Sequence, residues 1–284
     1  MESVAGKPCL VSLPGDFFTT CQLSRGPVLG FGMSGHVVLA TSLISPSQKR
    51  AVKILPLLTA DGGIRSKRLF NREVRILKEL SHPHVIKHVI SAVCPEYLAI
   101  CMQYCPNGTL AFKLKTMTPE LCVKYFIQMT CAVRYLNNKQ RIVHSDIKPD
   151  NIFINAINDP VLGDFGLAFF VPPGATRVPA KHIGGTKCFF APEIACSTSF
   201  VDPYKLDMYS LGVVLWCMMF KTEPTSDRVY ECLEDSQMFL NAPEPQGWCL
   251  ANSIQHDPDR RRSAVSMLKS LHSCDIHKDL IERL

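Results

Sequence analysis

The stretch His144–Asn151 reads HSDIKPDN, and Asp164 opens a DFG tripeptide a short way further along the chain. An aspartate such as Asp146, placed beside a substrate hydroxyl, can orient that hydroxyl and accept its proton. Lys148 supplies a positive charge that can neutralise a transferring phosphoryl group. Asn151 and Asp164 offer the hard oxygen ligands that suit Mg²⁺ beside phosphate. Any one of these strings can be a plain polar loop, but their joint occurrence in this order predicts phosphoryl transfer.

A glycine-rich string, GFGMSGHV, occupies residues 30–37. It is weak evidence by itself, because a plain turn or a dinucleotide-binding fingerprint has similar glycine spacing. The dinucleotide fingerprint needs a helix to begin at the glycines, whereas residues 37–39 favour a strand. We therefore expect a hairpin that folds over phosphates, since backbone amides at Gly30, Gly32 and Gly35 can approach an anion without a Cβ in the way.

Lys53 lies in a strand-forming run, residues 51–55, that a polar loop separates from a similar run at 37–40. The two runs suit an antiparallel pair. A lone strand lysine is usually a solvated side chain, and the functional alternative is an ammonium held against phosphate oxygens. That role needs a carboxylate to fix the lysine, and Glu73, on a helix predicted over about residues 67–80, is the candidate.

The chain changes from strand-like to helical near residues 103–108, which are typical of a turn. Thr118 is a good N-cap, and Pro119 follows at the first helical position, where its missing N–H costs nothing. Strands are predicted around 85–93 and 97–102, and helices at about 207–220, within 227–239 and at about 264–272.

The amino-acid composition limits the classes of protein to which the chain can belong. The chain has 284 residues, 46% hydrophobic and 20% charged, which suits one or two folded units. A net charge of +6 without a long Lys/Arg run does not demand nucleic acid. Thirteen cysteines without a CxxC pair favour reduced thiols in a cytoplasmic or nuclear protein over a disulfide framework. We expect no secretory signal and no membrane anchor, because the longest apolar run, residues 211–220, is too short.

Together with Ala191-Pro192-Glu193 and a run that begins at Asp207, these motifs resemble the eukaryotic protein kinase family. The resemblance extends from about Leu29 to Leu271. It implies an α+β, bilobal protein kinase fold as a single domain over residues 1–284. Its parts would be a small antiparallel β-rich N-lobe over about 20–102, a hinge over about 103–108 and a larger helical C-lobe over about 109–284.

The resemblance also implies a role for each motif residue. Asp146 would be the catalytic base, and Lys148 would contact the γ-phosphoryl group. Lys53, paired with Glu73, would hold the α- and β-phosphates of ATP. The remaining positions would bind cofactors, namely Mg²⁺ at Asn151 and Asp164, and ATP at Gly30, Gly32, Gly35, Val37, Ala51, Lys53, the gatekeeper Met102, and the hinge residues Gln103 and Cys105.

Structural roles follow from the same resemblance. Glu193 would pair with Arg261, so that the basic cluster at residues 260–262 would be partly structural. Asp207 would brace the backbone of the catalytic loop. His144 would pack within that loop rather than bind a metal.

Two features favour a serine/threonine kinase over a tyrosine kinase. Lys148 follows Asp146 in the serine/threonine pattern, and Gly185-Thr186 resembles a segment whose threonine touches the catalytic Asp and Lys. A turn threonine is the plain alternative. The implied activity is transfer of the γ-phosphoryl group of ATP to Ser/Thr hydroxyls of protein substrates.

Ser145 stands where the family usually has arginine before the catalytic aspartate. With arginine, a phosphorylated activation loop neutralises the buried positive charge and becomes ordered. Serine carries no charge, and residues 169–184 contain one hydroxyl side chain, Thr176. The hypothesis is that activity depends only weakly on loop phosphorylation. Because little of the chain follows the last expected helix, regulation by expression level or by a protein partner is expected.

Two alternatives stay open. A pseudokinase scaffold would bind partners without catalysis, and the presence of Lys53, Asp146, Asn151 and Asp164 disfavours it. A phosphotransferase for small molecules or lipids on a related fold is disfavoured by residues 185–193, which resemble a peptide-binding platform.

Overall fold

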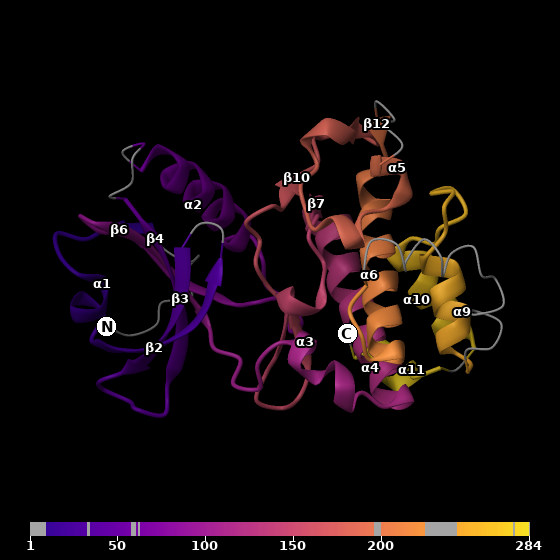
Figure 1. Ribbon diagram of the computed structural model, residues 1–284, viewed down its shortest axis with the longest axis horizontal. Coiled ribbons are helices and arrows are strands. Elements are labelled where there is room, and N and C mark those ends of the chain that lie inside the picture. Colours follow the sequence, from indigo (N-terminus) through magenta and orange to yellow (C-terminus); the bar gives the residue numbers. More distant parts are fainter. Residues whose placement is uncertain are drawn as a thin grey trace. The chain divides into compact units, whose positions relative to one another are not determined.

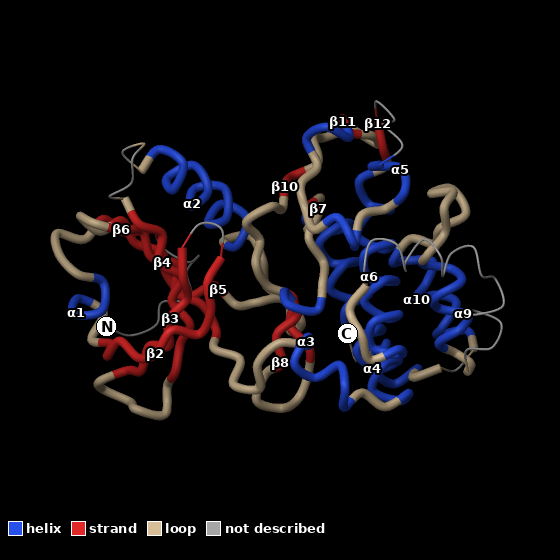
Figure 2. The backbone as a smooth tube through the Cα atoms, viewed as in Figure 1, coloured by secondary structure: helices blue, strands red, loops and turns tan. Residues whose placement is uncertain are grey.

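The computed structural model describes residues 10–32, 35–57, 61, 63–195, 200–224, 243–274 and 276–283 (Figure 1). Its contacts divide the chain into two compact units. The first comprises Met1–Ser81 with Ile86–Pro106, and the second comprises His82–Val85 with Asn107–Leu284. The first is built on a sheet and the second mainly on helices (Figure 2), which confirms the predicted α+β class. The helix predicted within 227–239 lies outside the described residues.

A six-stranded sheet in the order β1-β5-β6-β4-β3-β2 forms the first unit. Neighbouring strands are antiparallel except β1 and β5, which are parallel. The predicted antiparallel pair is confirmed as β3 and β4, with Val37 opposite Lys53. The strands are β1 Leu10–Ser12, β2 Leu23–Gly32, β3 Gly35–Ser42, β4 Lys49–Pro56, β5 His88–Val93 and β6 Tyr97–Gln103.

Helix α2, Ile64–Leu77, is the helix that the sequence predicts around Glu73. It begins earlier than expected because Gly63, in a left-handed conformation with φ 77°, supplies the turn that precedes it. Phe70, Val74 and Leu77 share its buried face, which packs against β4 and β6. This packing fixes where Glu73 lies relative to the sheet.

A short helix near the N-terminus, α1 Phe17–Thr20, was not predicted. Asp16 caps it, and the Tyr97 hydroxyl donates to Asp16 Oδ1 at 2.6 Å. Both Phe17 and Phe18 are buried in the core against β3 and β4. Four residues are too few for a helical period to be read from the sequence, so only the tertiary packing identifies this element.

Helices α4 and α6 pack against each other in the second unit, and α9 and α10 pack on them. Helix α4 begins as predicted, because Thr118 Oγ1 accepts the Leu121 N–H and Pro119 occupies the first turn. Helix α6 is apolar around its circumference, which suits its buried position. The α-helices among the described residues of this unit are α3 Leu110–Lys113, α4 Pro119–Arg134, α5 Pro192–Ala195, α6 Pro203–Phe220, α9 Gln246–Ser253, α10 Ala264–Ser273 and α11 Lys278–Glu282.

Short strands in the second unit frame the loops that carry the motifs. One loop follows β7 and leads into a 3-10 helix, and another lies between β9 and β10. The strand pairs, all antiparallel, are β7 Ile142–Val143 with β10 Phe169–Phe170, β8 Ile152–Ile154 with β9 Pro160–Leu162, and β11 Val178–Pro179 with β12 Phe200–Val201. The remaining turns of helix are the 3-10 helices Leu114–Thr116, Pro149–Asn151, Ala180–His182 and Lys187–Phe189, and the π-helix Tyr135–Gln140.

Within the described ranges, each helix falls short of the length or the hydropathy that a bilayer crossing requires. The ten cysteines that the structure describes are free thiols, and seven of them are buried. The seven buried ones act as small apolar side chains, as the sequence predicts for most of the cysteines.

Candidate active site

Lys53 and Glu73 form a buried ion pair in the first unit. Lys53 Nζ lies 2.8 Å from Glu73 Oε2 and 3.0 Å from Oε1, and the two residues are 8% and 2% exposed. Strand β4 presents the lysine and helix α2 presents the carboxylate. The predicted partner of the lysine is therefore present. Burying two charges is costly unless their geometry is good, so such a pair is weak evidence for stability and better evidence for a function.

The expected glycine-rich hairpin is formed by the end of β2 and the start of β3, with Gly30 opposite Val37 and Gly32 opposite Gly35. A Cβ on Gly35, at φ +156°, would lie 1.9 Å from the Ile54 carbonyl oxygen, so no side chain fits there. A Cβ on Gly30 would meet nothing within 4 Å. The absent side chain at Gly30 therefore leaves open space, as close approach of a ligand requires.

The end of β6 carries the residues predicted to bind adenine. Ala51 lies opposite Met102 in the sheet, and Met102 is buried. The Gln103 N–H donates to the Lys87 carbonyl at 2.9 Å, so the backbone of Gln103 can offer a ligand only its carbonyl. Cys105 is also buried, and burial raises the pKa of its thiol to about 11. At neutral pH this cysteine is an inert thiol.

Asp146 is the centre of a hydrogen-bonded cluster in the second unit. Its Oδ1 accepts from Thr186 Oγ1 at 2.7 Å, and its Oδ2 accepts from Asn151 Nδ2 at 2.9 Å. Lys148 Nζ donates to Thr186 Oγ1 at 2.9 Å and lies 3.6 Å from Asp146 Oδ2. The structure thus brings four of the motif residues together, including a threonine that lies 40 positions further along the chain.

Asn151 and Asp164 are the two residues that the sequence predicts as Mg²⁺ ligands. The Asn151 amide group donates to both the carbonyl and the carboxylate of Asp146, so its Oδ1 is the atom left to bind a cation. Asp164 is exposed, with φ 56°, and accepts from the Gly166 N–H at 3.4 Å. Nowhere in the described ranges do three or more His, Cys, Asp or Glu side chains gather as metal ligands. A cation held by these two oxygens would therefore need phosphate and water as further ligands, which suits Mg²⁺.

Asp207, on α6, binds the backbone of the loop that follows β7. Its carboxylate accepts the N–H groups of His144 and Ser145, both at 2.9 Å. Burial raises the pKa of Asp207, although its hydrogen bonds and the nearby imidazole oppose the rise. His144 Nδ1 accepts the Asp146 N–H, so Nε2 carries the proton and donates to the Gly163 carbonyl at 2.9 Å. His144 is fully buried against Phe165, as a packed loop residue.

Ser145 has a contact that the sequence did not reveal. Its Oγ donates to the carbonyl of Gly184 at 2.6 Å, and its backbone is left-handed at φ 71°. The neighbouring Gly185 lies so close that a Cβ would be 2.4 Å from the Ser145 carbonyl oxygen. The sequence indicates only that a charge is missing at position 145. The Ser145 hydroxyl bonds to a residue 39 positions away, and a local sequence pattern does not indicate such a contact.

Glu193 and Arg261 are paired as expected. Two guanidinium nitrogens of Arg261 donate to the Glu193 oxygens at 2.6 and 2.9 Å, and the guanidinium lies 4.9 Å from the centre of the Tyr209 ring. Arg261 is 1% exposed. In the same cluster Arg262 packs over Trp248, and the exposed Arg260 lies 3.7 Å from the Asp257 carboxylate.

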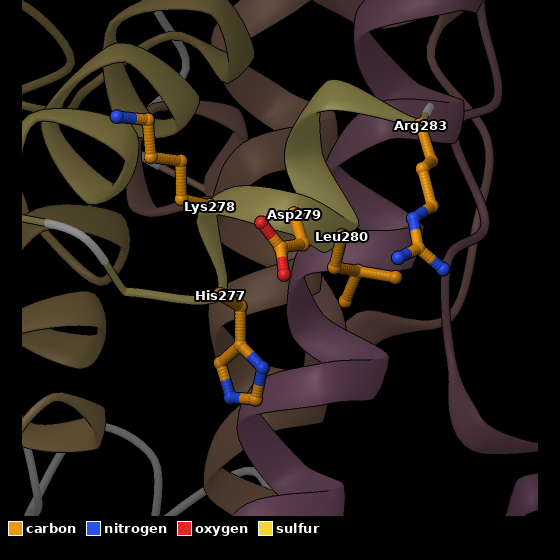
Figure 3. Close-up of a pocket in the computed structure, with 5 residues that line it drawn as sticks. All are labelled: His277, Lys278, Asp279, Leu280 and Arg283. Carbon is orange, nitrogen blue, oxygen red and sulfur yellow. The ribbon is translucent and has the colours of Figure 1, made fainter.

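A surface hollow beside α11 is lined by His277, Lys278, Asp279, Leu280 and Arg283 (Figure 3). All five residues come from one short stretch of chain, and their polar groups do not converge on a common point (Figure 3). The sequence predicts no site residue in this hollow. It is therefore a feature of the surface rather than a second candidate site.

Comparison with known proteins gives consistent results. The family model described as protein kinase domain matches residues 23–284. The probable serine/threonine-protein kinase drkA of Dictyostelium discoideum is 31% identical over 272 residues, covering 89% of this chain and 40% of that protein. The serine/threonine-protein kinase ppk34 of Schizosaccharomyces pombe is 36% identical over 161 residues, and ULK3 of Xenopus laevis is 28% identical over 213. These matches cover 54% and 70% of the chain and 44% of each relative, so the chain spans less than half the length of the curated relatives it matches.

Proposed function

Because the chain belongs to the protein kinase domain family, we propose that it transfers the γ-phosphoryl group of ATP to serine and threonine hydroxyls of protein substrates. The observation that carries this proposal is the cluster in which Asp146 meets Thr186, Lys148 and Asn151. A polar loop without a function gives no reason for a carboxylate, an ammonium, an amide and a hydroxyl to converge on one another. Phosphoryl transfer uses all four groups.

Asp146 acts as the catalytic base in this proposal. Its carboxylate would accept a hydrogen bond from the substrate hydroxyl, orient the oxygen toward the γ-phosphoryl group and take the proton as the new P–O bond forms and the bond between the γ-phosphorus and ADP breaks. Asn151 and Thr186 fix the carboxylate from both sides, which limits its rotation before the substrate arrives. Lys148 lies next to the same oxygens and offsets the negative charge of the transferring group.

ATP and Mg²⁺ are the cofactors that the residues fit. Lys53, positioned by Glu73, would hold the α- and β-phosphates, and the glycine-rich hairpin would cover them. The adenine would bind along Met102, Gln103 and Cys105, lined by Val37 and Ala51. Mg²⁺ would bind Asn151 Oδ1 and the Asp164 carboxylate, where it would neutralise phosphate charge.

The acceptor preference for serine and threonine is supported by Thr186. This hydroxyl donates to Asp146 and accepts from Lys148, the arrangement that the serine/threonine resemblance implies. The similar proteins named above are called serine/threonine-protein kinases. We extend that substrate class, proteins with Ser or Thr, to this chain. Ten free thiols in the described ranges support a reducing compartment, the cytoplasm or the nucleus.

A direct test compares the purified protein with Asp164→Asn in Mg-ATP turnover on a mixed peptide substrate. We expect the substitution to lower kcat by about 10²–10³, because a charged ligand for the metal is lost. Asp150→Asn, an exposed aspartate in the catalytic loop, is the control and should retain turnover. Equal background in the wild type and in Asp164→Asn would instead favour the pseudokinase scaffold.

Weak dependence on activation-loop phosphorylation is a further part of the proposal. Ser145 Oγ binds the Gly184 carbonyl, and Ser210 Oγ binds the Phe189 carbonyl at 2.8 Å. These two neutral hydroxyls hold the segment that contains Thr186 at both of its ends. The segment therefore has a source of order that needs no phosphate.

The measurement for this part is the activity of Thr176→Ala, because Thr176 is the one hydroxyl side chain in residues 169–184. We expect kcat/KM within about twofold of the wild type, since surface substitutions usually have small effects. Phosphatase-treated wild type should behave in the same way. Loss of activity in either sample would contradict the proposal.

A further inference from the structure

The activation segment between Asp164 and Glu193 contains no acidic residue. It contains Arg177, Lys181 and Lys187, so its formal charge is +3 with His182 neutral. All three side chains are exposed, and none makes an ion pair with another described residue. An exposed basic side chain is usually just solvated, so position relative to the reacting groups must decide whether these charges have a role.

Of the three basic residues, Lys187 is adjacent in sequence to a residue that contacts the catalytic aspartate. It directly follows Thr186, whose hydroxyl lies 2.7 Å from the Asp146 carboxylate. Its backbone is fixed, because it opens the 3-10 helix Lys187–Phe189, in which the Phe189 N–H donates to the Thr186 carbonyl at 2.9 Å. Phe189 is buried and its carbonyl is bound by Ser210. The backbone of Lys187 is thus fixed one residue from Thr186, and its side chain is exposed.

The Asp146 carboxylate is already engaged by other groups and does not neutralise Lys187. Asp146 already accepts from Thr186 and Asn151 and lies 3.6 Å from the Lys148 ammonium. A substrate acceptor hydroxyl must also reach Asp146, and an extended peptide advances only about 3.3–3.6 Å per residue. The residues that flank the acceptor therefore pass within reach of the long lysine side chain.

Building on the proposed function, we infer that the enzyme prefers acceptors with an acidic side chain one or two residues away, and that Lys187 is the residue that selects it. Arg177 and Lys181 add positive charge to the same segment and favour approach of acidic peptides. The recognised group is an anion, supplied either by Asp or Glu or by a previously phosphorylated residue. A solvent-exposed charge pair of this kind is expected to change kcat/KM by about threefold to fivefold.

The test is a positional-scanning peptide library with Mg-ATP and the full chain, with separate pools for Asp, Glu and phosphoserine at each position around a fixed acceptor. We expect an acidic residue to be selected at a position one or two residues from the acceptor. Selection of phosphoserine alone would identify a preference for pre-phosphorylated substrates, and selection of Asp and Glu would identify carboxylates. The preference should weaken at high ionic strength, because an exposed pair is screened.

Two variants test whether Lys187 causes the preference for acidic residues. Lys187→Glu should reverse the preference at that position toward Lys and Arg, and Lys187→Gln should remove it. Lys115→Glu is the matched control, since Lys115 is also exposed and also lies in a three-residue 3-10 helix of the second unit. It should leave the pattern unchanged. Melting curves of all three variants that match the wild type would show that the fold is intact.

Several results would overturn the inference. One is a wild type that phosphorylates the library without an acidic preference near the acceptor. Another is a folded Lys187→Glu or Lys187→Gln that keeps the wild-type pattern, as Lys115→Glu is expected to do. A wild type that phosphorylates no peptide would refute the proposed function itself, and the inference with it, so the two failures are distinguishable.

Discussion

Gly185 lies where the segment that carries Thr186 approaches the backbone of the catalytic loop. Its φ of +147° belongs to a region that side chains disfavour, and a Cβ would meet both the Ser145 carbonyl oxygen and the Phe190 ring. The contact from Thr186 to Asp146 depends on this close approach. A methyl group at position 185 would therefore force the backbone beside Thr186 to shift.

Gly185→Ala should lower kcat/KM for peptide substrates by at least about tenfold, because the strain of about 1–3 kcal/mol displaces Thr186. Gly184→Ala is a close control. A Cβ there would meet Leu167 at an ordinary 3.5 Å, and its φ is not in the disfavoured region. Steady-state kinetics with thermal melting would check both variants. Equal activity in the two would contradict the strain argument.

At the scale of elements, one ion pair ties helix α2 to strand β4. Glu73 is 2% exposed and bonds Lys53 through both carboxylate oxygens. Most of the other buried residues of α2 are apolar, for example Phe70 and Val74. Apolar packing holds the helix against the sheet, and the carboxylate fixes the ammonium. Removing one partner takes a 2.8 Å ion pair away from a buried charge, which is costly.

Glu73→Gln should therefore destabilise the protein, by about 3–5 kcal/mol at most, and raise KM for ATP more than KM for peptide. Glu79→Gln, an exposed glutamate just after the same helix, is the control and should change neither quantity. Urea denaturation and nucleotide titration would provide the two readouts. A Glu73→Gln enzyme with unchanged KM for ATP would show that the pair is merely structural.

At the scale of the whole molecule, both units bury histidines that are held neutral. Burial lowers the pKa of His88 in the first unit to about 4, and burial with neighbouring positive charges lowers that of His82 in the second to about 4. His84 is shifted downward as well, mainly by burial, although its bond to the Pro160 carbonyl opposes the shift. All three must remain uncharged for the fold to keep its full stability.

The sign of the pH dependence follows from these shifts. A histidine whose pKa is depressed in the folded state contributes stability above its unfolded pKa of about 6.5, and that stability is lost as pH falls toward the folded value. The free energy of unfolding should decrease below about pH 6.5, by up to about 1.4 kcal/mol per pH unit for each group. His88→Gln should flatten this decrease, whereas exposed His256→Gln should not. Urea titrations between about pH 7.5 and pH 4.5 would measure it, and identical slopes would contradict the assignment.

The sequence by itself determined the family, the α+β class and the identities of the motif residues. It could do so because each motif is local: a few side chains at fixed spacing around Asp146, at the glycines or before Glu193 are enough. Helix α4 was equally readable, since its cap at Thr118 and its apolar stripe are contiguous in the chain. The family and the motif residues can therefore be identified from short sequence motifs alone.

Only the tertiary structure decided how the motif residues are held. The hydroxyl of Ser145 finds the Gly184 carbonyl 39 positions away, and Asp207 reaches back to the His144 N–H across 63. The inferred role of Lys187 in substrate selection likewise rests on the tertiary contact between Thr186 and Asp146. Hydrogen bonds between such distant residues depend on how helices and strands pack. The period of an apolar face is visible in the sequence, but the pairing of two particular distant residues is not.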